Sequence, residues 1–257
     1  MRRIPIAVYA AFFCFAGAIV APRASADGPT ILGPTDGPFD ITIDTSQVPN
    51  LKDWADKELH PTLEKWYAII INDLPTEGFT PPTAFTVTLE ANGKGVAVTT
   101  GTRVTANAKW ITDQLTRGPK SEALGALVHE AVHVAQLYGK ASGPNKTTVW
   151  LREGIADYIR WWKYETAATR RPFKLNKPDG TPVSYQDGYH TTAQFLEYLA
   201  TTYDHEIVVK LNSAGRKGTY MPGLFMDYTG KSLDDLWFEF MGVMSKKVGS
   251  SSRATAP

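Results

Sequence analysis

Cysteine is almost absent from this sequence: its 257 residues include a single one, Cys14. One cysteine cannot form a disulfide within the chain, and it cannot supply the set of thiolates that a structural zinc site commonly uses. The folded part must therefore be stabilised by an ordinary hydrophobic core, for which a chain of this length suffices.

Long hydrophobic runs are also missing, with one exception near the N-terminus. Residues 4–20 are largely apolar, follow two arginines, and lead to the small-residue pattern A-S-A at residues 24–26. This order is typical of a secretory signal peptide, and the run is too short for a comfortable membrane span. We predict a signal peptide over residues 1–26, so that the protein is secreted or periplasmic and leaves the membrane after cleavage. The alternative is an uncleaved anchor.

Neither sign of charge is in large excess. The full chain has 27 basic and 26 acidic residues, and removal of residues 1–26 leaves 24 and 26, so the net charge changes from +1 to −2 with histidine neutral. A near-neutral exported domain has no electrostatic reason to bind nucleic acid. We expect a monomer with no nucleic-acid partner.

The remaining sequence alternates between strand-like and helix-like hydrophobic patterns. Strands are predicted where apolar and polar residues alternate, at residues 39–44, 84–89 and 102–111, with Asn92-Gly93 as a hairpin turn into residues 95–98. Helical spacing covers residues 51–74 with a break or kink at Pro61, and residues 121–139, 148–165, 189–203 and 233–248.

These patterns predict an α+β fold. A small antiparallel-rich sheet would pack on the helix of residues 121–139, which Ser121 caps and Gly139 ends, and a mainly helical C-terminal part would follow. No internal repeat is found, so we predict one domain over residues 27–248 and a disordered, polar tail over residues 249–257.

The motif H-E-x-x-H, formed by His129, Glu130 and His133, lies on that helix. Residues four apart share a helix face, so the two histidines can bind one ion, and Glu130 can reach a water on it. A catalytic zinc needs three protein ligands and one open position. The motif therefore supplies two ligands and a general base for hydrolysis. The alternative is a helix with two core or solvated histidines.

Glu153 and Asp157 are the candidates for the rest of the site. Nineteen residues separate His133 from Glu153, and Asp157 follows four residues later on an otherwise apolar helix. Two like charges on one face of a half-buried helix are costly unless something positive lies between them. Glu153 would be the third ligand of one Zn²⁺ ion, and Asp157 would hold a zinc histidine in the right tautomer. The alternative is two surface acids paired with neighbouring arginines.

This arrangement resembles the gluzincin metallopeptidases, thermolysin-like enzymes among them. More narrowly, residues from about 39 to 247 are similar to the plant basic secretory protein family and its bacterial relatives, on the segments HEAVHVAQ, EGIADYIR and GYHTTAQFLEYL. The resemblance implies a zincin-like peptidase fold with a small sheet over two zinc-binding helices. Unlike that family's name, this mature chain is not basic.

The resemblance also implies two further parts of the site. In gluzincins an edge strand ahead of the active helix binds the substrate backbone, and Asn107, Ala108 and Trp110 match the corresponding N-A-x-W. An ordinary strand is the alternative. A tyrosine or histidine often stabilises the oxyanion, for which Tyr189 is the first choice and Tyr185 and His190 compete.

The sequence thus predicts an exported zinc peptidase that acts on peptides or proteins. Two alternatives remain open: an exported binding or defence module that keeps a zinc site, and an amidase acting on cell-wall peptides. A structural zinc does not need Glu130, which argues against the first, whereas the second would use the same zinc chemistry.

Overall fold

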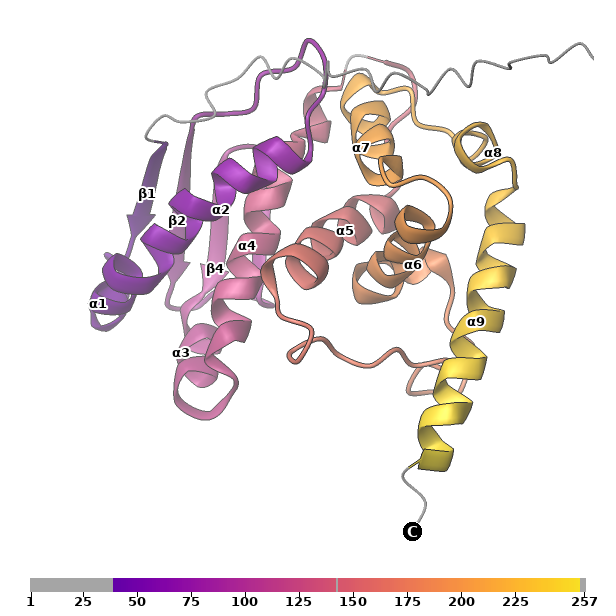
Figure 1. Ribbon diagram of the computed structural model, residues 1–257. Helices are drawn as coiled ribbons and strands as arrows, with labels where there is room; N and C mark the ends of the chain where they lie inside the picture. Colours follow the sequence, from indigo (N-terminus) through magenta and orange to yellow (C-terminus); the bar gives the residue numbers. More distant parts are fainter. Residues whose placement is uncertain (1–38, 142, 255–257) are drawn as a thin grey trace, which may run out of the picture. The chain divides into compact units, whose positions relative to one another are not determined.

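The computed structural model describes residues 39–141 and 143–254 (Figure 1). These residues belong to one compact unit of the chain, Ile31–Pro257; a separate unit, Met1–Thr30, contains none of them. The predicted signal peptide and the end of the predicted tail, residues 255–257, lie outside the described residues. No helix in the described ranges is long and apolar enough to cross a membrane.

A four-stranded sheet forms one side of the described part. Its strands lie in the order β1-β2-β4-β3, with bounds β1 Asp40–Asp44, β2 Ala84–Glu90, β3 Ala97–Thr100 and β4 Arg103–Asn107. β1 pairs with β2 and β2 with β4 in parallel, and only β3 and β4 are antiparallel. The sheet is therefore mixed, which corrects the expected antiparallel-rich sheet, while the α+β fold class is confirmed.

The hairpin predicted at Asn92-Gly93 is wrong, because β2 and β3 are not neighbours. β1 and β4 occupy the two sides of β2, so the returning chain pairs with β4 instead and makes β3 the edge strand. The actual hairpin joins β3 to β4 through residues 101–102. Gly101 has a φ of +62°, which suits the first position of such a two-residue turn.

β4 is shorter than the predicted strand of residues 102–111. It ends at Asn107, whose Oδ1 accepts a hydrogen bond from the Trp110 backbone N–H at 3.2 Å and caps helix α3, Ala108–Arg117. The buried positions Ala108 and Ile111 are three apart, as a helix requires, although the alternation up to Trp110 imitated a strand. β4 is also an interior strand of the sheet.

The helices pack against the sheet and then against one another (Figure 1). Their bounds are α1 Lys52–Trp54, α2 His60–Asp73, α4 Lys120–Gln136, α5 Val149–Tyr158, α6 Tyr189–Thr202, α7 Ile207–Lys217, α8 Leu224–Thr229 and α9 Leu233–Ala254. A π-helical segment, Ala55–Leu59, joins α1 to α2 at the break predicted near Pro61, and another, Ile159–Tyr164, extends α5. α2 and α4 contact the sheet, and α5 and α6 pack closely together.

Several helix ends differ from those predicted. α4 begins at Lys120 after Pro119, without a side-chain cap, so Ser121 is not the cap residue. It ends at Gln136 because Leu137 adopts a left-handed conformation with a φ of 46°, two residues before Gly139. α9 continues to Ala254, into the tail predicted as disordered. Helices α3, α7 and α8 were not predicted.

Arg216, near the end of α7, joins the ends of three helices. Its guanidinium donates a hydrogen bond to the backbone carbonyl of Leu74, just after α2. It donates another, of 2.7 Å, to the backbone carbonyl of Ala135 in the last turn of α4. Carbonyls at helix C-termini carry partial negative charge, so they favour a buried cation. Burial lowers the pKa of Arg216 to about 10. Since α4 carries both histidines, this contact fixes the C-terminal end of the candidate site.

Candidate metal centre

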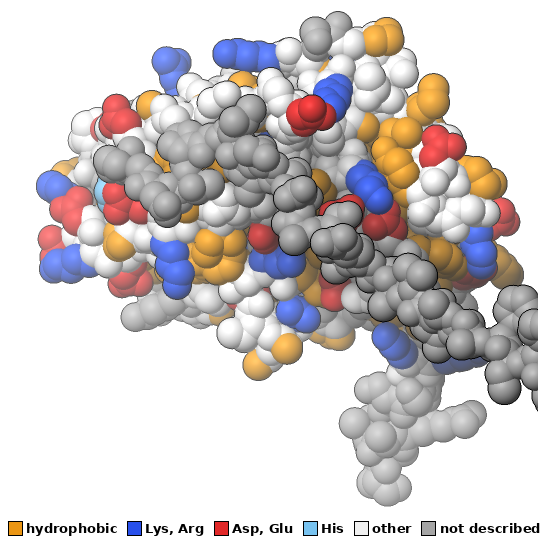
Figure 2. Space-filling model, turned by 45° about the horizontal axis from the view of Figure 1, so that its top comes forward, with side chains coloured by type: hydrophobic (Ala, Val, Ile, Leu, Met, Phe, Trp, Pro, Cys, Tyr) orange, Lys and Arg blue, Asp and Glu red, His pale blue; other side chains and the backbone are white. Residues whose placement is uncertain are grey.

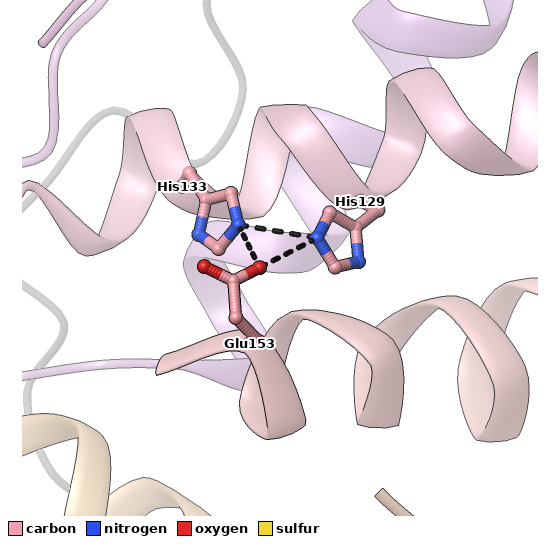
Figure 3. A group of neighbouring side chains, drawn as sticks. All are labelled: His129, His133 and Glu153. Carbon is pink, nitrogen blue, oxygen red and sulfur yellow. Dashed lines mark hydrogen bonds and ion pairs between the residues drawn. The ribbon is translucent and has the colours of Figure 1, made fainter. Parts of the chain in front are cut away.

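Two buried helices hold the side chains of the candidate site. α4 carries His129, Glu130 and His133, and α5 carries Glu153 and Asp157. Figure 3 shows both histidines pointing from one helix towards Glu153 on the other. Four of these five residues, all except His133, are buried, with 5 to 8% of each residue exposed. The three residues predicted as zinc ligands are therefore brought together, across nineteen intervening residues, by the packing of α4 on α5.

Three potential ligand atoms meet at one point. Nε2 of His133 lies 3.1 Å from Nε2 of His129 and 3.1 Å from Oε2 of Glu153, and the His129–Glu153 distance is 3.3 Å. Zinc bonds of about 2.0–2.1 Å at tetrahedral angles place ligand atoms about 3.3 Å apart. These separations fit a single zinc ion. Within the described residues, this is the one group of histidine and acidic side chains close enough to hold a metal.

The other ring nitrogen of each histidine has its own acceptor. Nδ1 of His129 donates to Oδ1 of Asp157 at 2.6 Å, and Nδ1 of His133 donates to Oε1 of Gln136 at 2.7 Å. With Nδ1 protonated in neutral rings, both Nε2 atoms present lone pairs to each other and to a carboxylate. Lone pairs that face one another in this way repel unless a cation lies between them. Two imidazole nitrogens and a carboxylate oxygen are also the kind of donor set that binds a metal ion.

The pKa values of His129 and Glu153 reflect the same demand for positive charge. Burial opposes charging of His129, but the charge of Asp157 and hydrogen bonds from its ring to Asp157 and Glu153 outweigh it and raise its pKa to about 10. Burial likewise disfavours ionised Glu153, but its bonds to both histidines hold the pKa of that carboxyl well below its usual range. The two carboxylates thus favour a positive charge between the histidines, which a bound metal ion would supply.

Arg152 and Gln136 fix the orientation of the third ligand. The Arg152 guanidinium donates twice to Oε1 of Glu153, at 2.7 and 3.0 Å, which leaves Oε2 facing the histidines. The Gln136 amide donates to the backbone carbonyl of Arg152 at 3.1 Å while its oxygen holds His133. The two helices are therefore linked by polar groups around the site as well as through the ligands. The sequence had suggested Arg152 only as a possible ion-pair partner of a surface acid, whereas Glu153 is buried, and it had assigned Gln136 no role.

Replacing Asp157 by Asn is expected to weaken zinc affinity about 10- to 100-fold. The two oxygens of Asp157 accept hydrogen bonds from His129 and from the Trp161 indole N–H, the latter at 3.2 Å. An asparagine would remove the negative charge beside His129. Its NH₂ group would also face one of these two donors and could not accept a hydrogen bond from it. A competition titration with a chromophoric chelator measures the change. Asp227→Asn, at an exposed position on α8, is the matched control. Unaltered affinity in Asp157→Asn would contradict the assigned role.

Glu130 lies beside the ligand group without belonging to it. Its Oε2 accepts a hydrogen bond of 2.6 Å from the Thr99 hydroxyl on the edge strand β3. Both residues line a cavity of about 940 Å³ that also contains His129, His133 and Glu153. A buried carboxylate held at the wall of a large cavity, next to a metal-binding group, is placed for proton transfer. Thr99 could not be identified from the sequence, because no pattern links it to residue 130.

Of the three residues predicted as candidates for oxyanion stabilisation, two line the cavity and one does not. Tyr189 lines the cavity, and its ring stacks on that of His129 with 6.1 Å between the ring centroids. Its backbone has a φ of 46°, which is unfavourable for a residue other than glycine. His190 also lines it, between Trp161 and Trp162, and its buried Nε2 has no partner among the described residues. The Tyr185 hydroxyl instead donates to Asp234 at 3.1 Å, outside the cavity.

The segment proposed to bind the substrate backbone is not at the cavity. Asn107, Ala108 and Trp110 do not line it, because they form the junction between β4 and α3. The edge of the sheet that faces the cavity is β3 instead, with Val98 and Thr99 among the lining residues.

Comparison with known proteins gives one match. Residues 51–240 match the family model BSP, described as "Peptidase of plants and bacteria". No curated protein and no solved structure matches the chain. The matched range contains the ligand group, Glu130 and Tyr189.

Proposed function

Because the chain belongs to the BSP family of plant and bacterial peptidases, we propose that it is a zinc-dependent peptidase with Glu130 as general base. The observation that carries the proposal is the convergence of two imidazole nitrogens and a carboxylate oxygen within 3.3 Å, with a second buried carboxylate beside them. His129, His133 and Glu153 would hold the metal. Zinc, when bound, lowers the pKa of water and polarises a carbonyl group.

The protein's own groups would then move and hold protons. Glu130 takes the proton of the attacking water and delivers it to the leaving amine, as a general base and then acid. The Thr99 hydroxyl fixes one oxygen of that carboxylate, so the other is available to the water. Tyr189 lines the cavity and is exposed, and its hydroxyl is our candidate donor to the carbonyl oxygen as that oxygen gains negative charge.

The substrate backbone would bind along β3. An edge strand has unpaired backbone N–H and C=O groups that can add an extended peptide as a further strand. β3 has one neighbour, β4, and lines the cavity beside Glu130, so a peptide added there would lie across the metal group. This assigns to residues 96–101 the role that the sequence pattern had suggested for residues 107–110.

The site of action follows from the N-terminal segment. We propose that residues 1–26 direct export and are removed, so that the peptidase works outside the cytoplasm as a single-domain monomer. A binding module with a structural zinc would need neither Glu130 nor a cavity at the metal. The family membership and the cavity therefore favour the enzyme over the module.

The test combines metal analysis with peptide hydrolysis. The mature protein, purified without added metal, is expected to contain about one zinc per chain and to cleave members of a mixed peptide library that includes cell-wall peptides. A chelator should abolish cleavage, and zinc should restore it. Absence of bound zinc, or hydrolysis that persists after zinc removal, would overturn the proposal; cleavage of cell-wall peptides alone would narrow it to the amidase.

A further inference from the structure

The cavity extends along α4 to both sides of the candidate metal centre. At one end it is lined by Ala126 with Arg160, Trp161 and Arg171, and at the other by residues 136–140 with Arg152. Ala126 and Gln136 are ten residues apart, which is about 15 Å along a helix. A bound peptide would therefore pass the metal group in the middle and meet a different set of side chains on each side of the bond to be cleaved.

Acidic and basic side chains lie at different depths in this cavity. Its acidic side chains, Glu130, Glu153 and Asp157, are all buried in the catalytic centre. Its exposed charged side chains are all basic: Lys140, Arg152 and Arg171. A substrate approaching the opening therefore meets positive charge first, at both ends of the cavity.

Arg171 presents its charge at the Ala126 end. It shares the carboxylate of Glu122 with Arg160, at 2.9 and 2.7 Å. Both guanidinium groups also lie over the Trp161 ring. Glu165 also interacts with both arginines, but it is buried, accepts a hydrogen bond from Thr169 at 2.9 Å and does not line the cavity. The Arg171 side chain is 62% exposed, so it is the group that a ligand can reach.

At the other end of the cavity, Arg152 forms an ion pair with Glu153, whereas Lys140 is not paired with an acidic residue of the described part. Lys140 follows α4 in a short 3₁₀ turn, Tyr138–Lys140, and is exposed. It forms no ion pair within the described part of the chain. An uncompensated ammonium group at the end of a cavity is available to bind an anionic side chain.

The excess of positive charge at the opening of the cavity is not explained by the net charge of the protein. The mature chain has two more acidic than basic residues, and on the face drawn in Figure 2 red and blue side chains are interspersed. Basic side chains at both ends of the cavity are therefore a local property. Fields of one sign at a cleft attract ligands of the opposite sign.

We propose that the preferred substrates are acidic polypeptides with Asp or Glu on both sides of the cleaved bond, bound by Lys140 at one end and Arg171 at the other. This rests on the proposed peptidase function, because it defines what occupies the same cavity. The basic groups bind ground state and transition state alike, so they should act mainly on KM and on the association rate. Salt should weaken them, since both groups are exposed.

The experiment compares three peptides of one sequence, with Glu, Gln or Lys flanking the cleaved bond. The wild-type protein is expected to cleave the Glu peptide with a kcat/KM about tenfold above that of the Gln peptide, with the Lys peptide lowest and the difference decreasing at high salt. Lys140→Gln and Arg171→Gln should each reduce the ratio of kcat/KM for the Glu peptide to that for the Gln peptide about threefold, with the larger loss falling on the Glu peptide. Arg171→Gln keeps Glu122 paired with Arg160, so the fold should persist.

Lys65→Gln, at an exposed lysine on α2 outside the cavity, is the matched control and should retain the full preference. Binding of the same fluorescent peptides, measured by anisotropy, separates two kinds of failure. Equal hydrolysis of the Glu and Gln peptides, or a preference that survives in the Lys140→Gln/Arg171→Gln double variant, overturns this inference alone. Selective binding of the Glu peptide without cleavage overturns the peptidase function and supports acidic recognition; no binding and no cleavage overturn both.

Discussion

Replacing Glu130 by Gln is expected to lower kcat/KM for peptide hydrolysis about 10²- to 10⁴-fold, the range for loss of a general base. Gln keeps the size of the side chain and can still accept the hydrogen bond from Thr99, but it cannot take a proton from water. The loss should appear in kcat, because proton transfer occurs in the chemical step. Steady-state kinetics on any cleaved peptide measure it.

The zinc content distinguishes this effect from loss of the metal. The ligand group is His129, His133 and Glu153, so Glu130→Gln should bind zinc as the wild type does. Thr99→Val is a second comparison: it removes the hydroxyl that orients Glu130 and should cause a smaller loss, because the base is retained. Hydrolysis near the wild-type rate in zinc-loaded Glu130→Gln would refute the role of this carboxylate.

The largest loss of stability is expected from Gly154→Ala. A Cβ atom at this position on α5 would lie 2.2 Å from Cγ2 and 2.6 Å from Cβ of Thr192 on α6, far inside van der Waals contact. Thr192 is fully buried and its hydroxyl donates to the Tyr185 carbonyl at 2.6 Å, so it cannot turn away without loss of that bond. Overpacking of this kind costs about 3 kcal/mol of unfolding free energy, and the preference of a helix for alanine over glycine offsets about 1 kcal/mol of it. The net loss of about 2 kcal/mol lowers Tm by roughly 4–8 °C in a domain of this size.

Gly242→Ala provides the matched control, since a Cβ on that residue of α9 would meet nothing within 4 Å. Alanine favours a helix over glycine by about 1 kcal/mol, so this variant should be more stable than the wild type. Adding Thr192→Ala to Gly154→Ala removes the closer of the two clashing atoms and should recover part of the loss. Thermal unfolding that gives the same Tm for Gly154→Ala and wild type would show that α5 and α6 are not so closely packed.

The sequence was most informative where the chemistry demands fixed spacing. H-E-x-x-H with a distant acid pair predicted that His129, His133 and Glu153 meet, because helix periodicity constrains the first two and charge repulsion identified the third. The helices that carry them and the α+β class were predicted from the same periodicity.

Long-range pairing could not be predicted in the same way. The hydrophobic pattern of β3 is compatible with β2 or β4 as its neighbour, so a turn-forming Asn92-Gly93 gave the wrong partner. The alternation that ended at Trp110 fitted a strand and a helix equally over a few residues. Contacts such as Thr99 with Glu130 depend on this topology and have no local signature.

The left-handed backbone at Tyr189 makes that position an informative one for directed evolution. Glycine and asparagine adopt such a φ at little cost, whereas other residues, tyrosine included, carry a penalty of about 1–2 kcal/mol. In a library randomised at residue 189, survival of heat challenge should enrich glycine and asparagine. Screening for turnover should keep tyrosine if its hydroxyl assists the reaction. The amino acid recovered would thus report which property was under selection.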